Sequence, residues 1–219
     1  MSDTLNVDEV KRMFEYVAGA VVDSEAELTV IDKKIGDGDH GTNMALGFRE
    51  VRKELRAKEF DSVNEVFHCV GMTLLDTMGG ASGVLFGTLF ISGIVGLTPL
   101  KAIDLAALAK IFQKSLTALK KRGKARVGDK TMVDAVEPAV AALLEAAAAG
   151  QPLAQGLAAG AAGARAGMEY TKQCVARFGR AKSFGQASLG LEDAGAVSVS
   201  IIFRAMAQWV QQNHAGDIG

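Results

Sequence analysis

The sequence predicts an all-α fold in which eight helices form a bundle with short loops. Apolar residues recur at three- and four-residue spacing along most of the chain, and the second half is rich in alanine, the strongest helix former. No apolar run stands between turn signals as a β-strand would. Because 49% of the 219 residues are hydrophobic and 22% are charged, as in ordinary folded proteins, we expect residues 1–219 to form a single domain.

The expected helices are bounded by glycines and capping residues. Glycine and aspartate are concentrated from Thr29 to Gly41, which predicts an acidic loop between the first two helices. Ser62 and Glu65 are spaced as in a capping box, and Gly79-Gly80 would end the helix that follows them. The eight helices are expected at about residues 6–30, 43–56, 62–78, 83–96, 101–121, 131–149, 153–177 and 194–213.

Composition and charge argue against several classes of partner. A net charge of -1 offers no general attraction for nucleic acid or anionic lipid. The polar segment Met1–Glu9 lacks the features of a secretory signal, and Cys69 and Cys174 have no partner at metal-ligand spacing. The uncharged stretch Thr77–Leu100 is interrupted by glycines and by Pro99, so it predicts a short buried helix and not a membrane span. We expect a cytoplasmic protein that binds neither nucleic acid nor membrane.

Asp32, Asp37 and Asp39 surround a glycine-flanked turn and indicate a metal site. Their carboxylates are oxygen ligands of the kind that Mg²⁺ and Ca²⁺ prefer, and their spacing does not fit a calcium-binding EF-hand loop, so magnesium is favoured. Without a cation the three charges would raise one another's pKa values, unless the side chains were splayed apart in solvent. Mg²⁺ usually completes its shell with waters and substrate phosphates, so the aspartates predict a nucleotide site.

A second glycine-rich segment, Gly79–Gly83, is a candidate phosphate cradle. At a helix start its backbone N–H groups and the helix dipole would attract anions, although a helix end followed by close packing explains the same glycines equally well. The P-loop pattern is absent from the sequence, which excludes an ordinary P-loop enzyme. His40 would project from the same turn as the aspartates, whereas we assign no role to His68 or His214.

Four separated motifs resemble the nucleotide-binding L subunit of dihydroxyacetone kinase, the DhaL family, across nearly the whole chain. They are Ile35–Met44, Gly79–Gly83, Gly128–Met132, and Gly179–Ala181 followed by Asp193–Ala196. That family folds as an eight-helix antiparallel up-and-down barrel, with the nucleotide and two magnesium ions held in the loops at one end. The resemblance therefore implies the same barrel for this chain.

The resemblance also assigns residues to the site. It implies that Asp32, Asp37 and Asp39 coordinate magnesium and bridge it to the phosphates of ADP or ATP. The positions that match nucleotide contacts of the family are His40, Gly41, Thr42, Asn43, Ala81, Ser82, Gly123, Met132, Asp193, Ala194 and Gly195. Phosphoryl transfer depends mainly on positioning and charge neutralisation, so no catalytic nucleophile is expected from this chain.

The resemblance further implies partners. In the family, phosphate passes to dihydroxyacetone or a related small ketose that a separate K subunit holds through a histidine. Where phosphoenolpyruvate drives the reaction, ADP stays on the L subunit as a coenzyme and a phosphocarrier M subunit rephosphorylates it, whereas other members use ATP directly. We expect a phosphotransferase subunit that works with a K subunit, with or without an M subunit, as a homodimer or hetero-oligomer. The alternative is a non-catalytic regulatory paralogue that binds nucleotide.

One segment departs from the phosphoenolpyruvate-dependent pattern. Where that pattern has the arginine of Y-x-G-E-R-S-x-G-x-x-D-P-G, this chain has Ala187, within Ser183–Gly195. An arginine near the phosphates would neutralise charge, so its absence predicts faster nucleotide exchange and favours direct use of ATP. Arg180 and Lys182 are the nearby cations that could compensate.

Overall fold

A computed structural model describes residues 3–214, which are mostly helical. Within these residues nine α-helices, two 3₁₀-helices and two short strands follow one another. In order they are β1 (Thr4–Asn6), α1 (Val7–Asp23), α2 (Glu25–Ile35), α3 (His40–Ala57), α4 (Val63–Thr77), α5 (Gly80–Ile91), β2 (Ala102–Asp104), α6 (Leu105–Gly123), α7 (Val133–Ala148), α8 (Leu153–Tyr170), η1 (Thr171–Gln173), η2 (Arg180–Ser188) and α9 (Ala194–His214).

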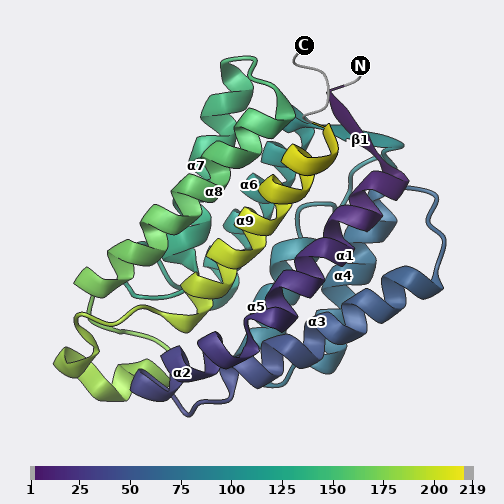
Figure 1. The fold of residues 1–219 in the computed structure, drawn as a ribbon. Coiled ribbons are helices and arrows are strands. Elements are labelled where there is room, and N and C mark those ends of the chain that lie inside the picture. The colour runs from purple at the N-terminus through teal and green to yellow at the C-terminus, as the bar shows by residue number, and fades with distance from the viewer. Residues whose placement is uncertain (1–2, 215–219) are drawn as a thin grey trace.

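Eight of these helices form a closed ring (Figure 1). α1 packs against α3, each helix from α3 to α9 packs against the next, and α9 returns to α1. α2 is outside the ring and lies at one end of it, against α3 and α9. The expected all-α, eight-helix barrel is therefore confirmed. Its core includes a row of aromatic side chains that cross the barrel. Phe14 contacts Phe67 (5.0 Å between the centroids of the aromatic rings), Phe67 contacts Phe112, and Phe112 contacts Phe203.

The prediction of one first helix over residues 6–30 is wrong. α1 ends at Asp23, the Ser24 hydroxyl donates to the Ala20 carbonyl (2.8 Å), and α2 then turns across the end of the barrel. Apolar residues recur on both sides of this turn, so periodicity alone does not reveal the change of direction. The residues that α2 buries are Leu28, Ile31 and Ile35.

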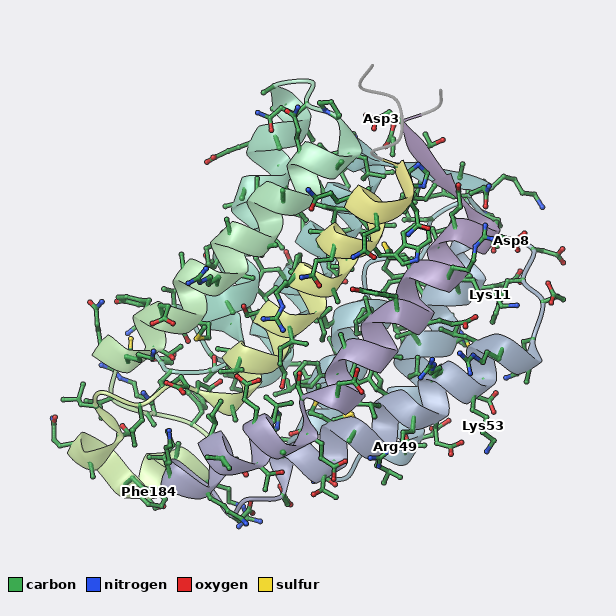
Figure 2. The ribbon with its side chains drawn as sticks, in the orientation of Figure 1. Asp3, Asp8, Lys11, Arg49, Lys53 and Phe184 are labelled. Carbon is green, nitrogen blue, oxygen red and sulfur yellow. The ribbon has the colours of Figure 1, made fainter. Side chains whose placement is uncertain are left out.

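The connections alternate between the two ends of the barrel, as an up-and-down topology requires. The α3–α4, α5–α6 and α7–α8 connections lie at the same end as β1, and hydrogen bonds join them. The Val63 N–H donates to the Leu100 carbonyl (2.9 Å), and the Leu153 N–H donates to the Asp3 carboxylate (2.8 Å). We call this the closed end; Asp3 marks it in Figure 2.

β1 and β2 form an antiparallel ribbon at the closed end, with Leu5 opposite Ile103. The prediction that the chain contains no strand is therefore wrong. Each strand has only three residues, too few for an alternating apolar pattern to be recognised in the sequence. Leu5 and Ile103 are both buried, so the ribbon covers the core at this end.

Other helix bounds also differ from the predicted ones. The helix expected at 101–121 begins at Leu105, because Ala102–Asp104 form β2. The helix expected at 83–96 runs from Gly80 to Ile91, and the helix expected at 153–177 ends at Tyr170, where the chain enters a long connection. The uncharged stretch around α5 thus contributes a helix of 12 residues. None of the helices in residues 3–214 is long and apolar enough to cross a membrane.

Candidate nucleotide and metal site

The end of the barrel opposite the ribbon holds a cavity of about 960 Å³. Its lining consists of residues in the α2–α3, α4–α5, α6–α7 and α8–α9 connections and at the helix ends beside them. We call this the open end. Figure 2 marks it with Phe184, on η2, at the far end of the molecule from Asp3.

All three predicted magnesium ligands and nine of the eleven predicted nucleotide contacts line this cavity. They are Asp32, Asp37, Asp39, His40, Asn43, Ala81, Ser82, Gly123, Met132, Asp193, Ala194 and Gly195. These residues come from four separate parts of the chain, and the fold brings them together. The other two lie on α3 outside the lining, where Gly41 packs against Glu25 and Thr29 of α2 and Thr42 is exposed.

The three aspartates converge although they belong to different elements. Asp32 lies on α2, which corrects the expectation of a loop from Thr29 onward, whereas Asp37 and Asp39 lie in the short connection before α3. One carboxylate oxygen of each lies within 4.8 Å of the others. In the part of the chain that the structure describes, no other three acidic, histidine or cysteine side chains meet this closely. The arrangement fits a divalent cation bound through oxygen atoms.

The α2–α3 connection is folded back over Asp32. The Asp32 carboxylate accepts hydrogen bonds from the N–H groups of Gly38 (2.8 Å) and His40 (3.2 Å). Gly38 has a φ of +80°, which residues with side chains rarely adopt, and a Cβ atom on Gly36 would collide with the Asp32 carboxylate. The two glycines therefore allow the turn that places Asp37 beside Asp32.

The negative charge of this aspartate group is only partly balanced. Burial, followed by the charge of Asp37, raises the pKa of the Asp39 carboxyl. Arg180 supplies one cation, since its Nε lies 2.8 Å from the Asp37 Oδ2. One guanidinium beside three carboxylates leaves the group net negative, so a divalent cation would be stabilised there.

Four helices, α3, α5, α7 and α9, begin at the open end because the helices alternate in direction. The first N–H groups of a helix have no intrahelical acceptor and carry the positive end of the helix dipole. Gly79 caps α5 without a side-chain hydrogen bond, and Ala81 and Ser82 of its first turn line the cavity. At the start of α9, Asp193 accepts a hydrogen bond from the Ala196 N–H (2.8 Å). This set of helix starts suits the binding of phosphate groups.

His40 joins the start of α3 to α9. Its ring is buried, and Nε2 lies 2.8 Å from the Ser198 hydroxyl. Burial lowers the pKa of the imidazole, which favours the neutral form of the ring. His40 lies beside the aspartates as expected, and its observed contacts hold two walls of the cavity together.

Sequence reasoning missed Lys130, which is almost completely buried at the cavity. Its Nζ donates to the carbonyls of Thr171 (2.7 Å) and Leu191, and so fastens the α8–α9 connection to the start of α7. Burial lowers the pKa of this amine, and burial raises the pKa of the Asp193 carboxyl to about 7. The available signal was the polar run Asp129-Lys130-Thr131 just before a helix.

An apolar wall of the cavity was also missed, because helical periodicity alone assigns such residues to the core. Its members are Ile35, Val84, Leu85, Phe86 and Phe178, beside the predicted Met132. An apolar wall close to charged groups and helix starts suits a ligand that has an aromatic base and an anionic tail.

Comparison with known proteins identifies the family. The sequence profile of the DAK2 domain matches residues 34–208. The chain belongs to the DAK2 domain family. The matched part of this DAK2 domain contains every predicted site residue except Asp32, which lies two positions before it.

This DAK2 domain is similar to subunits of bacterial kinases. It is 36% identical over 205 residues to the ADP-binding subunit DhaL of PEP-dependent dihydroxyacetone kinase 1 from Listeria innocua. The aligned region covers 94% of this chain and 98% of that subunit. It is also 36% identical over 190 residues to the ADP-binding subunit DhaL of the PEP-dependent dihydroxyacetone kinase from Escherichia coli, covering 86% of this chain and 90% of that subunit. These findings confirm the resemblance seen in the motifs.

The fold is similar to one part of a longer kinase. The dihydroxyacetone kinase of C. freundii, in its complex with AMP-PNP and Mg²⁺, aligns with a TM-score of 0.72 and 28% sequence identity. The alignment covers 91% of this chain and 33% of that kinase. The DAK2 domain therefore corresponds to about a third of the longer chain.

Proposed function

We propose that this protein is the nucleotide-binding L subunit of a dihydroxyacetone kinase-type complex. It holds ADP or ATP through magnesium, and phosphate passes to dihydroxyacetone or a related small ketose on a separate K subunit. The main support is that three aspartates and four helix starts meet at one cavity, in a chain similar to ADP-binding subunits over most of their length. The regulatory alternative is not favoured, because the relatives are named kinases or kinase subunits.

Asp32, Asp37 and Asp39 would hold two magnesium ions. When bound, magnesium would neutralise phosphate charge and orient the phosphoryl group for transfer. The carboxylates already lie together, and the N–H groups of Gly38 and His40 hold Asp32 in its place. The chain therefore contributes position and charge to the reaction, with no nucleophile of its own.

The nucleotide would contact two kinds of wall. The apolar wall suits the adenine base, and the helix starts suit the phosphates. Gly41 and Thr42 belong to the first turn of α3, so they would contribute backbone N–H groups. The residues that we propose to contact the nucleotide are His40, Gly41, Thr42, Asn43, Ala81, Ser82, Gly123, Met132, Asp193, Ala194 and Gly195.

The proposed partners follow from the same comparison. The relatives that this chain matches over most of their length are named as subunits of PEP-dependent kinases, so a K subunit would supply the ketose and an M subunit could supply phosphate. Homodimer or hetero-oligomer formation belongs to this proposal. We place the complex in the cytoplasm, in keeping with the free thiols of Cys69 and Cys174.

The residue at position 187 bears on whether the phosphate donor is ATP itself or a phosphocarrier that acts on retained ADP. Ala187 lies on η2 and is exposed, and its methyl group offers no positive charge to the nucleotide. We propose that the nucleotide exchanges readily, which favours direct use of ATP.

Isothermal titration calorimetry of ADP and ATP, with and without Mg²⁺, tests these proposals on protein stripped of nucleotide. We expect binding that requires Mg²⁺. ADP that stays bound through long dialysis would contradict the exchange proposal and support a phosphocarrier, whereas exchangeable ATP would support direct transfer. Absence of Mg²⁺-dependent binding for both nucleotides would overturn the proposed function. Phosphorylation of dihydroxyacetone after mixing with a K subunit then distinguishes a kinase subunit from a non-catalytic paralogue.

A further inference from the structure

The α8–α9 connection is the longest of those at the open end. It runs from Thr171 to Asp193 and contains η1 and η2. Figure 1 shows it projecting from the end of the barrel, with η2 beside α2. Residues 178–181 of this connection line the cavity. The place of the connection relative to the helices therefore determines the shape of the cavity.

Both ends of this connection meet at Lys130, which belongs to the α6–α7 connection. The Lys130 Nζ donates to the carbonyl of Thr171, where the α8–α9 connection begins (2.7 Å), and to the carbonyl of Leu191, near its end. The Gly190 N–H donates to the Lys172 carbonyl (2.8 Å) and joins the same two ends. We call these three hydrogen bonds the neck of the connection.

The turn that carries Lys130 is itself fixed. The buried Asp134 carboxylate accepts from the N–H groups of Gly128 (2.6 Å) and Thr131 (2.7 Å), on either side of Lys130. Between them Lys130 has a φ of +60°, which residues with side chains rarely adopt. A methionine would fill the same space without the cost of burying a charge, so the amine is suited to holding the two carbonyls.

Other hydrogen bonds of the connection lie within it. The Ser188 hydroxyl accepts from the Ala176 N–H (3.0 Å) and donates to the Gly185 carbonyl (2.7 Å). These bonds hold the shape of the connection but not its place on the barrel. The Arg177 N–H donates to the carbonyl of Asp129, the neighbour of Lys130 (3.2 Å). The turn around Lys130 therefore contacts the connection at its beginning, middle and end.

The neck leads directly into the start of α9. The Asp193 N–H donates to the Thr171 hydroxyl (3.0 Å), and the Asp193 carboxylate accepts from the Ala196 N–H (2.8 Å). Because the Thr171 carbonyl accepts from Lys130, a single residue links the buried amine to a helix start at the cavity.

We propose that Lys130 is a positioning residue for the nucleotide. By holding both ends of the α8–α9 connection, its amine keeps residues 178–181 and the start of α9 in the places that bind the nucleotide. This inference rests on the proposed function and adds to it a residue that acts through others.

Hydrogen exchange of the nucleotide-free protein, followed by NMR, tests the positioning by itself. In the parent, the Gly190 and Asp193 amides should exchange more slowly than the amides of exposed residues of η2. In Lys130→Met they should exchange at least about tenfold faster, because the neck loses two hydrogen bonds from a charged donor. Amides at the centres of α1 and α4 should change much less, whereas a general loss of stability would raise both sets of rates.

Calorimetry then measures the effect on the nucleotide. A connection that is in place for only part of the time lowers the apparent affinity by that fraction, so Lys130→Met should bind ADP roughly tenfold more weakly at saturating Mg²⁺. Lys130→Arg keeps the positive charge and the N–H donors, so it should recover part of both changes. Circular dichroism confirms that each variant is folded.

Lys124→Met is the matched control. Lys124 also has a positive φ (+55°) and follows α6, but it is exposed and outside the cavity lining. Its substitution removes the same charge and should leave the exchange of the neck and the ADP affinity unchanged. Loosening of the neck by Lys124→Met as well would overturn the specific role of Lys130.

Two results in Lys130→Met would also overturn the inference: parent-like exchange of Gly190 and Asp193, or parent-like ADP affinity after the neck has loosened. If this variant does not fold, the parent decides, since a neck that exchanges as fast as η2 is not held by Lys130. If the parent binds no ADP with Mg²⁺, the proposed function fails, whereas the exchange rates still report whether Lys130 holds the connection.

Discussion

The two ends of the barrel are built from the same helices but differ in what their connections contact. At the closed end the connections bond to one another: Lys101 Nζ donates to the Asp61 carbonyl (2.8 Å), and the Asn64 side chain accepts from the Leu100 N–H (3.0 Å). At the open end the connections surround a cavity, and three like charges lie within 4.8 Å of one another. Polar groups of the closed-end connections are paired with one another, whereas polar groups of the open-end connections line a cavity that can take a ligand.

We therefore expect stability and binding to depend on opposite ends of the barrel. Substitutions at the open end should change ligand affinity and leave the fold intact, whereas substitutions at the closed end should do the reverse. Variants at each end test how complete that separation is.

Asp37→Ala should have the largest effect on binding. Removal of one of three closely placed carboxylates takes away a magnesium ligand, so Mg²⁺-dependent affinity for nucleotide should fall by roughly 100-fold or more. The helical content should remain that of the parent, because Asp37 is exposed and lies in a loop. Calorimetry and circular dichroism measure the two quantities.

Asp76→Ala is the control for Asp37→Ala, since it removes an exposed carboxylate that lies on α4 outside the nucleotide cavity. It should leave nucleotide affinity unchanged. Parent-like nucleotide affinity in Asp37→Ala would refute the metal assignment, and loss of helical content would show that the open end also supports the fold.

Ile103→Ala should act on stability at the closed end. Ile103 is 1% exposed and pairs with Leu5 in the ribbon, so truncation leaves a cavity and should lower the free energy of unfolding by about 2–4 kcal/mol. Urea unfolding measures this change, and Mg²⁺–ADP affinity of the folded variant should match the parent. Val95→Ala, at a side chain that is 63% exposed, should change stability by less than about 0.5 kcal/mol. A clear fall in nucleotide affinity in Ile103→Ala would mean that the two ends are coupled.

Ala187→Arg should have the smallest effect, at the open end. Ala187 itself lies outside the cavity lining, but an arginine there restores the residue of the phosphoenolpyruvate-dependent pattern, and its long side chain would extend toward the phosphates. Release of ADP should therefore slow by about tenfold. Stopped-flow measurement with a fluorescent ADP analogue gives the rate. Ala158→Arg, at an exposed position of α8 outside the cavity lining, should leave the rate unchanged. Equal release rates in the parent and Ala187→Arg would show that position 187 does not reach the nucleotide.

The helices of the ring could be predicted because their signals are local. Ser62 caps α4 by accepting from the Glu65 N–H (3.3 Å), three positions away, as the capping pattern predicts. The ribbon and the separate course of α2 could not be predicted, since both depend on packing between distant segments. Leu5 and Ile103, for example, pair although the five helices α1 to α5 separate them in the sequence.

The candidate site also combines residues that local sequence signals reveal with residues that only the packing of distant segments reveals. The aspartates lie within a short stretch of sequence, so their spacing alone indicates a metal site. The contacts of Lys130 and Arg180 could not be read in this way. Lys130 donates to Leu191, 61 positions away, and Arg180 meets Asp37 through the packing of η2 beside α2. Only the fold reveals which basic residues of the chain lie at the cavity.

The even number of helices in the ring returns the described chain to the closed end, where the His214 Nε2 lies 3.4 Å from the Glu9 carboxylate. α9 alone has 21 residues and spans roughly 30 Å at the usual rise of an α-helix. A partner domain joined close to Asp3 or close to His214 would therefore begin on the side opposite the cavity mouth. To reach the cavity, its tether would have to run the length of the barrel. The length and stiffness of that tether would then set the effective concentration of the partner domain at the cavity.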